Sequence, residues 1–320
     1  MQRFLITGGS GFIGTNVVDA LLRDGRYHVL SLDVNAPRKA AHRPYWQQAD
    51  LLDSDALHAA IAAFRPHYVL HLAARTDLRG KSIDDYAANT TGMANLLDAL
   101  DGVAELKQAV FTSSMLVCRA GYMPQNDHDY APSTFYGESK VRTEEIIRAH
   151  RPHYLWSIVR PTSIWGPWFG EPYANFFRMV LSHTYIDLGR HACRKTYGYI
   201  DNAVYQTMAI FQAPAADVAE KVFYLGDYEP YNISEWAREI GAAAHIRIPR
   251  APFWLFRCAA LVGDLLTACR LRFPMTSFRL KNMTTDNIID MAATQRIAPD
   301  LPVSREEGNR RTLAWLAAQT

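Results

Sequence analysis

Residues 7–14 read Thr-Gly-Gly-Ser-Gly-Phe-Ile-Gly and directly follow the apolar run Phe4-Leu5-Ile6. Their glycines satisfy two related spacings: G-x-G-x-x-G at Gly9, Gly11 and Gly14, and G-x-x-G-x-x-G at Gly8, Gly11 and Gly14. Glycines lack a Cβ atom, so a turn built from them lets the backbone approach a pyrophosphate, and a following helix points its N-terminal N–H groups at the phosphates. The stretch therefore predicts a dinucleotide site, with an ordinary glycine-rich turn between a strand and a helix as the alternative.

The residues after this turn supply the context that such a site requires. Apolar residues continue at helical spacing from Val17 to Leu22, and a second apolar run, 29–32, ends in Asp33. A carboxylate there accepts hydrogen bonds from the adenosine ribose and repels a 2′-phosphate, which favours NAD over NADP. Arg38 and Lys39 follow closely enough to keep NADP open, and a solvated turn aspartate is the other interpretation.

The composition indicates a globular protein without a strongly charged partner. A chain of 320 residues suffices for one large domain or two modest ones, and 49% hydrophobic with 21% charged residues is ordinary globular usage. The formal charge of +2 and the absence of arginine or lysine tracts argue against a nucleic-acid partner. The N-terminus runs straight into an apolar strand, so we expect no signal peptide, no membrane span and a cytoplasmic location.

Cysteine and histidine positions predict neither disulfides nor a metal site. The cysteines are scattered without metal-ligand spacing and are expected to be reduced thiols: Cys118, Cys193, Cys258 and Cys269. The pairs His67/His71 and His150/His153 have spacings that can bind a metal, but no carboxylate or cysteine completes a set.

The order of apolar runs predicts an α/β fold with a doubly wound parallel sheet, the Rossmann arrangement. Segments long enough for crossover helices separate five expected strands, at 4–6, 29–32, 68–72, 109–112 and 157–159. We assign 1–160 to this domain and 161–320 mainly to a smaller, mixed α/β substrate lobe, because proline and glycine break the pattern after Pro161. Within 195–225, the runs 197–200 and 222–225 are expected to be strands that return to the sheet.

A second group of functional residues begins at Tyr136. Tyr136 and Lys140 lie four residues apart, so in a helix they share one face. A tyrosine has an ordinary pKa of about 10, and a nearby cation stabilises its phenolate and lowers that value. Alone, this spacing is a frequent accident of a solvated helix face; downstream of the glycine turn it predicts a general base.

The strand at 109–112 runs into Ser113 and Ser114. A serine at the carboxyl end of a parallel strand sits where ligands bind in open α/β sheets, and its hydroxyl can hydrogen-bond a substrate oxygen. The alternative is that these serines cap the following turn.

Taken together, these motifs make the chain similar to the extended short-chain dehydrogenase/reductase family, in particular its NAD-dependent nucleotide-sugar epimerases and dehydratases. Further segments resemble the family's along nearly the whole length: Asp50-Leu51, His71 to Ala74, Asn89 to Leu97, Arg160-Pro161, Gly166-Pro167 and Lys195 to Asn202. The resemblance selects Ser114 over Ser113.

The resemblance implies NAD as cofactor, a nucleotide-sugar substrate, a place in polysaccharide biosynthesis and a homodimer formed through helices of the sheet domain. It implies that Tyr136 is the base, that Lys140 binds the nicotinamide ribose, and that Ser114 orients the substrate hydroxyl. The implied cofactor contacts are Gly8, Gly11, Phe12, Ile13, Gly14, Asp33, Asp50, Leu51, Leu72, Ala73, Ala74, Asn89, Tyr136, Lys140 and Pro161. The implied substrate contacts are Ser114, Lys195 and Arg279.

Departures from the family pattern narrow the reaction. Sugar 4,6-dehydratases usually carry an Asp-Glu pair directly after the catalytic hydroxyl residue, and here Met115 and Leu116 stand at those positions. Lys195 replaces the usual diphosphate-facing arginine, which keeps a cation but loses the bidentate fork. We therefore expect epimerisation of a nucleotide-activated sugar, at C4. The alternatives are an oxidoreductase acting on a sugar ketone or a hydrophobic alcohol, similar to 3β-hydroxysteroid dehydrogenases, and a catalytically silent nucleotide-binding protein.

The segment 251–271 is rich in apolar and aromatic residues but is interrupted by charges, which argues against a membrane span. We expect a buried helix of the substrate lobe. The alternative is an apolar surface for a lipid-linked sugar or a hydrophobic substrate. Residues 273–287 resemble the family's late segment that closes over the nucleotide, in which Arg279 is either a phosphate contact or a solvated arginine.

Overall fold

The computed structural model describes residues 1–268, 271, 273 and 275–319. The chain forms two compact units. The sheet unit comprises 1–162, 200–226 and 290–302, and the second unit comprises 163–199, 227–289 and 303–320 apart from the residues just excluded.

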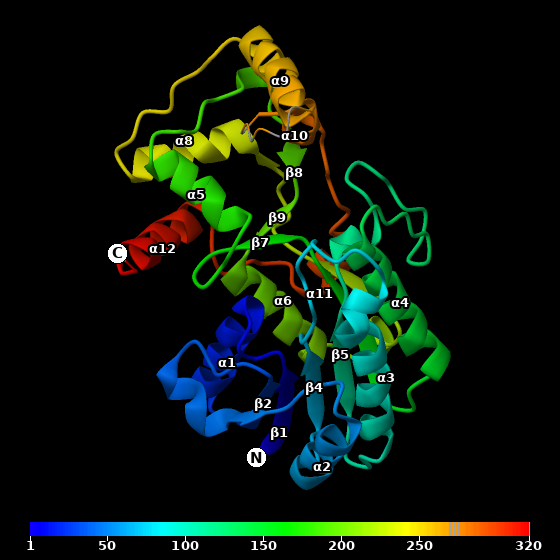
Figure 1. Cartoon of the computed structure of the whole chain (residues 1–320). Coiled ribbons are helices and arrows are strands. Elements are labelled where there is room, and N and C mark those ends of the chain that lie inside the picture. Colours follow the sequence, from blue (N-terminus) through cyan, green and yellow to red (C-terminus); the bar gives the residue numbers. More distant parts are fainter. Residues whose placement is uncertain (269–270, 272, 274, 320) are drawn as a thin grey trace. The chain divides into compact units, whose positions relative to one another are not determined.

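A seven-stranded sheet, all of whose strand pairs are parallel, forms the centre of the sheet unit (Figure 1). Its strands in chain order are β1 (Gln2–Thr7), β2 (Tyr27–Asp33), β3 (Trp46–Gln48), β4 (Tyr68–His71), β5 (Gln108–Thr112), β6 (Leu155–Pro161) and β10 (Val222–Leu225). The five strands expected from the sequence are confirmed. They are continuous apolar runs because helices cover both faces of the sheet.

The spatial order β10-β6-β5-β4-β1-β2-β3 reverses direction between β1 and β4. Ligands of open α/β sheets bind outside the carboxyl ends of the strands at such a point. Two helices cover one face, α1 (Phe12–Asp24) and α6 (Ile200–Gln212); three cover the other, α2 (Ser54–Phe64), α3 (Ala87–Asp101) and α4 (Phe135–His150). The expected doubly wound fold is confirmed.

Shorter elements complete the sheet unit: η1 (Ala40–Tyr45), η2 (Asp84–Tyr86), η3 (Met115–Val117), α7 (Ala215–Val218) and α11 (Ala292–Ile297).

Two strand assignments differ from expectation. β3 was not predicted, because three residues at the sheet edge, two of them glutamines, leave no apolar signal. The run at 197–200 does not return to this sheet, whereas 222–225 does: β9 (Tyr197–Tyr199) pairs with β7 (Ser163–Trp165) in a separate two-stranded sheet, and Ile200 begins α6.

The second unit is organised around an aromatic cluster. Trp165 and Trp236 lie 5.0 Å apart between ring centroids, and Phe177, Tyr199 and Tyr231 contact one or both of them. Its remaining elements are α5 (Tyr173–Leu181), η4 (Gly189–His191), β8 (Arg194–Lys195), β11 (Tyr231–Asn232), α8 (Ile233–Ala243), α9 (Phe253–Ala268), α10 (Ser277–Thr284) and α12 (Arg305–Ala317).

The prediction of a buried helix within 251–271 is wrong in its burial. Helix α9 forms, but most of its described side chains are not buried; Phe256 and Ala260 are those that belong to the buried residues of the local core. Trp254 and Leu265 on its outer side are 62% and 67% exposed. Cys269 and Arg270 lie outside the described residues. No helix in the described part of the chain has the length and apolarity needed to cross a membrane.

A buried ion pair joins α4 to β6 within the sheet unit. Arg160, with a side chain 1% exposed, donates to both carboxylate oxygens of Glu144 at 2.8 Å. Its guanidinium also lies over the rings of Tyr130 and Tyr224 and donates to the Asp127 carbonyl. The carboxylate holds the pKa of Arg160 above its ordinary value, although burial opposes this.

We predict that Glu144→Gln lowers the free energy of unfolding by about 3 kcal/mol, because it leaves a buried guanidinium without its counter-charge. The matched change Glu145→Gln removes an exposed pair with Arg142 and is expected to cost less than about 0.5 kcal/mol. Urea unfolding followed by circular dichroism measures both. Equal stability of the two variants would contradict a structural role for the buried pair.

Candidate active site

The glycine turn between β1 and α1 is shaped by close backbone contacts. Gly8 has a φ of +80°, and a Cβ atom there would lie 2.5 Å from the backbone nitrogen of Ala73, after β4. A Cβ on Gly14 would collide with the backbone of Gly8. These two positions therefore require glycine for the fold itself, whatever binds the turn.

Gly11 differs, because a Cβ there would meet, among the described residues other than its sequence neighbours, one atom within 4 Å, the Gly8 carbonyl oxygen at 3.2 Å. Gly11 is the N-cap residue of α1 and has no side chain to cap Phe12, Ile13 or Gly14 in the first helical turn. The protein's own packing thus leaves the space beside Gly11 open, next to the backbone N–H groups of a helix N-terminus. This arrangement fits a pyrophosphate.

Asp33 lies at the carboxyl end of β2, beside the glycine turn. Its carboxylate accepts from the backbone N–H groups of Ser10 and Asn35, both at 2.9 Å. The guanidinium of Arg38 donates to the Ser10 carbonyl oxygen at 2.9 Å, and its pKa is lowered by burial while Asp33 raises it. A carboxylate and a guanidinium, the groups that discriminate between the two dinucleotides, are thus both next to the turn.

Leu51 is held against α3. Its carbonyl oxygen accepts from Asn95 at 2.8 Å, and its side chain fills the space that a side chain on Gly92 would occupy. Asp50 beside it is exposed and accepts from the N–H of Leu52. The pair expected beside the adenine therefore has a buried apolar member and a solvent-facing carboxylate.

Asn89, predicted as a cofactor contact, connects two elements of the site. Its amide accepts from the Arg75 N–H and donates to the Arg75 carbonyl and to the Ser139 hydroxyl, at 2.8 to 3.0 Å. It therefore ties the segment after β4, which holds the half-buried Leu72, Ala73 and Ala74, to α4. Pro161 ends β6 opposite Leu225.

Ser114 has the capping role that the sequence offered as one alternative, and this role leaves the other open. It is the N-cap residue of η3, and its hydroxyl oxygen accepts from the Leu116 N–H at 3.1 Å. Because a hydroxyl that accepts a hydrogen bond still has a proton to donate, capping leaves Ser114 able to bind a substrate oxygen. The hydroxyl of Ser113 is buried and has no hydrogen-bond partner among the described residues.

Tyr136 and Lys140 share one face of α4, which begins at Phe135 with Thr134 as its capping residue. Tyr136 is 8% exposed, and its ring lies 6.1 Å from that of Tyr86. Lys140 is fully buried and donates to the Thr112 carbonyl oxygen at 2.9 Å, at the end of β5. Burial lowers the pKa of Lys140 to about 8.

His71, at the end of β4, is a neutral neighbour of this lysine. Its ring lies 2.7 Å from the Thr7 hydroxyl, and burial together with Lys140 lowers its pKa to about 3. An imidazole that is neutral and already hydrogen-bonded leaves Lys140 to supply the positive charge. Among the described residues, no three His, Cys, Asp or Glu side chains are grouped as metal ligands.

The sequence pattern that defines the NAD dependent epimerase/dehydratase family matches residues 4–226. The chain belongs to this family. NAD is its cofactor, and the glycine turn, Asp33 and the Lys140 face of α4 are the parts of this chain that fit it.

Two relatives show the range of proteins to which this chain is similar. A 3 beta-hydroxysteroid dehydrogenase/Delta 5-->4-isomerase from Mycobacterium tuberculosis is 30% identical over 269 residues, covering 78% of this chain and 71% of its own length. An N-acetyl-alpha-D-glucosaminyl-diphospho-ditrans,octacis-undecaprenol 4-epimerase from Escherichia coli O157:H7 is 25% identical over 320 residues, covering 97% and 94%. One relative is named for a steroid and the other for a lipid-linked sugar.

Solved structures of the epimerase/dehydratase type share the fold. The UDP-glucose 4-epimerase of Thermotoga maritima aligns with a TM-score of 0.77 and 20% identity, covering 99% of each chain. The UDP-glucuronic acid 4-epimerase of Bacillus cereus, solved with NAD, aligns with a TM-score of 0.76 and 18% identity, covering 100% of this chain and 97% of its own.

The two predicted family phosphate contacts lie in the second unit. Lys195 donates from Nζ to the Asn282 carbonyl oxygen of α10 at 2.8 Å. Arg279 is the third residue of the same helix and is exposed. Its guanidinium nitrogen Nη2 lies 3.8 Å from the sulfur of Met179. Lys195 therefore already has a partner within its own unit, a backbone carbonyl of the helix that carries Arg279.

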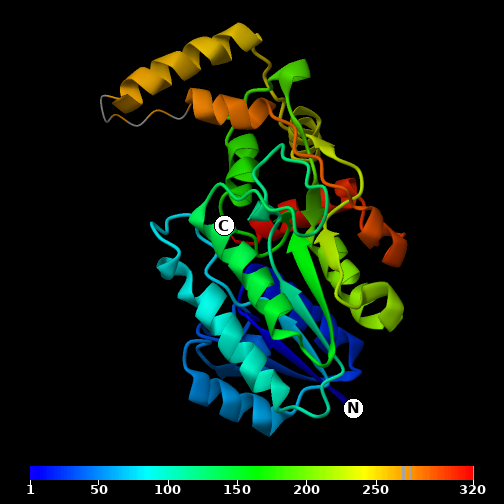
Figure 2. The same ribbon diagram turned by 90° about the vertical axis from the view of Figure 1, so that its right-hand side faces the viewer.

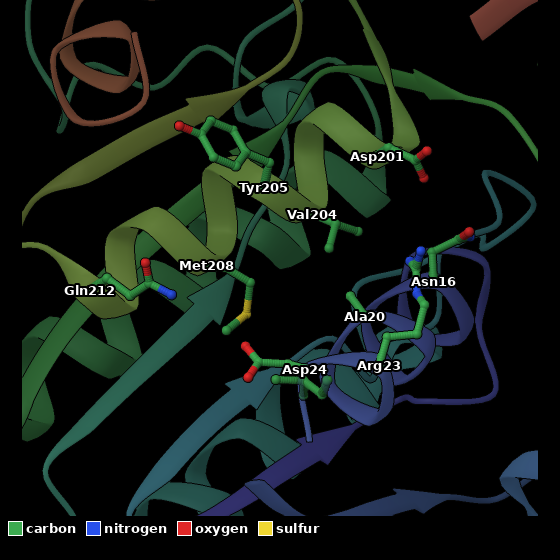
Figure 3. Close-up of a pocket in the computed structure, with 10 residues that line it drawn as sticks. Asn16, Ala20, Arg23, Asp24, Asp201, Val204, Tyr205, Met208 and Gln212 are labelled. Atoms are coloured by element: carbon green, nitrogen blue, oxygen red, sulfur yellow. The ribbon is translucent and has the colours of Figure 1, made fainter. Parts of the chain in front are cut away.

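A hollow of about 240 Å³ lies between α1 and α6 of the sheet unit (Figure 3). Helix α6 contributes Asp201, Tyr205 and Met208, and α1 contributes Asn16 and Arg23. None of the predicted cofactor, catalytic or substrate residues lines it, so it is separate from the candidate site.

A close contact that the sequence did not reveal sets Ser114 beside α4. A Cβ on Gly137 would lie well inside van der Waals contact of the Leu116 carbonyl oxygen, so η3 packs directly on the first turn of α4. Gly137 stands between Tyr136 and Lys140 in sequence. A glycine inside a helix often indicates a close backbone approach, and this signal could have predicted the contact with η3.

We predict that Gly137→Ala lowers the free energy of unfolding by about 1–3 kcal/mol, because an added Cβ overpacks this contact. Activity should fall at least tenfold as η3 moves away from α4. Gly102→Ala is the control, since its Cβ would meet nothing nearer than 3.9 Å. Urea unfolding and turnover test both variants, and a Gly137→Ala protein as active and stable as Gly102→Ala would refute the contact.

We predict that Asp33→Asn shifts preference from NAD toward NADP. The neutral amide binds the ribose hydroxyls less strongly, by about 1.5–3 kcal/mol for lost charged hydrogen bonds, and no longer repels a 2′-phosphate beside Arg38. Calorimetry with each dinucleotide should show the ratio of the Kd values change at least tenfold. The control is Asp98→Asn, an equal charge change on the exposed face of α3, which should leave the ratio of the Kd values unaltered. If Asp33→Asn also left that ratio unaltered, Asp33 would be only a solvated turn residue and the prediction would be wrong.

Proposed function

We propose that this protein is an NAD-dependent 4-epimerase of a diphosphate-activated sugar, of which nucleotide sugars are the principal class. The observation that carries the proposal is the arrangement of Ser114, Tyr136 and Lys140 at the carboxyl edge of the sheet, together with Met115 and Leu116 where a dehydratase needs an acid and a base. The relatives named for 4-epimerisation add support.

Bound NAD supplies a hydride acceptor that returns the hydride later in the cycle. We infer that the phenolate of Tyr136 takes the proton of the C4 hydroxyl while the C4 hydride leaves, so that the carbon becomes a ketone. Ser114 donates to the same oxygen and holds it in place. Rotation of the keto sugar presents its other face, and Tyr136 then returns the proton as the carbon is reduced with inverted configuration.

Lys140 assists by its charge. A buried ammonium is costly, and its pKa of about 8 reflects this cost. A phenolate at Tyr136 would relieve it, so the lysine favours the deprotonated form of the base. The low exposure of Tyr136 and Lys140 keeps water away from the proton that they control.

One observation favours a second candidate, an NAD-dependent oxidoreductase of a hydrophobic alcohol. The steroid dehydrogenase from Mycobacterium tuberculosis is 30% identical to this chain, more than the 4-epimerase from Escherichia coli. The outer side of α9 is also apolar and exposed. The two candidates use the same three residues and differ in whether the cofactor is regenerated within each turnover.

We further propose that the protein is located in the cytoplasm and forms a homodimer.

We predict that the purified protein, once denatured, releases near-stoichiometric NAD, and that it converts UDP-glucose or UDP-glucuronic acid to the C4 epimer without added cofactor. Chromatography with mass spectrometry measures both. An empty protein that instead oxidises a 3β-hydroxysteroid, with NADH formation at 340 nm, would replace the epimerase proposal with the second candidate.

We also predict that Tyr136→Phe lowers kcat by about 10²–10⁴-fold, the usual contribution of general acid–base catalysis, while NAD remains bound. Tyr122→Phe is the control, because its hydroxyl donates to Asp129 rather than serving the site. Full activity of Tyr136→Phe would refute the role of Tyr136 under either candidate function.

A further inference from the structure

Helix α9 has two apolar faces. Its inner face packs on α10 and the local core through Phe256 and Ala260. Figure 2 shows the two helices, in orange, lying side by side in the second unit. The opposite face carries exposed residues at spacings of three and four: Trp254, Cys258, Leu261 and Leu265. A surface helix of a water-soluble protein normally presents charged residues there.

The exposure of this outer face is large for apolar side chains. Leu261 and Leu265 are each 67% exposed, and Trp254 is 62% exposed. Leu255 and Val262 lie beside them at 42% and 51%. We call these five side chains the α9 apolar face. Contiguous apolar patches of this kind mark a surface that contacts a partner or a membrane.

Basic residues outnumber acidic ones in the segment that carries this face. Residues 245–285 contain seven arginine and lysine residues and one acidic residue, Asp264, although the whole chain has a net charge of only +2. Arg250, Arg257 and Lys281 are exposed. The carboxylate of Asp264 accepts from the Ser277 N–H, which ties it to the start of α10. The α9 apolar face thus lies in a segment whose sequence is mainly basic, with Arg257 exposed on the helix itself.

This combination identifies the chemistry of the partner. A helix that exposes leucine and tryptophan within a basic segment binds the interface of an anionic bilayer, where the apolar side chains enter the acyl boundary and the segment's cations meet headgroup phosphates. Tryptophan is enriched at that depth. A second copy of the chain would carry the same positive charge, so its approach through this surface would be opposed.

We propose that the α9 apolar face docks on the surface of an anionic phospholipid bilayer. The helix lies in the interface and does not cross it, since α9 has 16 residues. The inference concerns surface binding alone, so it stands independently of the sugar chemistry proposed above. It places the protein where substrates with lipid anchors or hydrophobic bodies are concentrated.

Sedimentation with vesicles tests the proposal directly on the full chain, without substrate. Vesicles of phosphatidylcholine with 30% phosphatidylglycerol should bind the protein at least tenfold more strongly than pure phosphatidylcholine. Raising the salt concentration should weaken the binding, because the headgroup attraction is screened. Absence of binding to the anionic vesicles would overturn the proposal.

A double variant locates the contact. Leu261→Glu with Leu265→Glu should reduce binding to anionic vesicles at least tenfold, and because both side chains are exposed the fold should persist, as circular dichroism will show. Met123→Glu with Leu78→Glu is the matched control in the sheet unit, where these side chains are 66% and 58% exposed. Equal loss in both double variants, or none in the first, would contradict docking through α9.

Insertion is measured by fluorescence quenching. Phosphatidylglycerol vesicles with brominated acyl chains should quench the wild-type protein, and Trp254→Phe should lose most of that quenching while still sedimenting with vesicles. Size-exclusion chromatography gives the remaining outcome: an oligomer that the Leu261→Glu, Leu265→Glu variant dissociates, without vesicle binding by the wild type, would assign the face to a second copy and overturn the proposal.

Discussion

Direct backbone contact at the carboxyl edge of the parallel sheet is the constraint on which the candidate site depends. Gly8 lies against Ala73, and Gly14 lies against Gly8, so the glycine turn sits at a fixed distance from β4. Gly137 likewise lies against the Leu116 carbonyl oxygen, so η3 sits at a fixed distance from α4. No side chain intervenes at these places, and the functional side chains that project from them therefore have little freedom to move apart.

The electrostatics of the site follow from this tight construction. Lys140 is buried deeply enough that its pKa falls to about 8, and its ammonium donates to a neutral carbonyl oxygen, that of Thr112, rather than to a carboxylate. Glu144, one helical turn further along α4, attracts the ammonium, but its carboxylate is already paired with Arg160. The positive charge is consequently available to an anion forming nearby, and Tyr136 is on the same face of the helix.

The second unit uses a different kind of stabilisation. Tryptophan and tyrosine rings around Trp165 and Trp236 form its core, and Gly308 of α12 lets that helix approach the rings of Trp165 and Tyr199. Among the described residues, the buried side chains of α9 belong to a separate cluster with Leu188 and Leu280. A helix supported by so few buried side chains, with an apolar outer face, is consistent with a role at a surface.

Periodicity and motif spacing determined the sheet, the dinucleotide turn and the placement of Tyr136 and Lys140 on one helix face, because these depend on contacts within a few residues or on strands that are apolar on both sides. Tertiary structure decided the rest. The pairing of β9 with β7 and the packing of Gly137 on Leu116 join residues distant in sequence. The exposure of α9 was likewise beyond the sequence, since an apolar segment has the same composition whether a core covers it or water does.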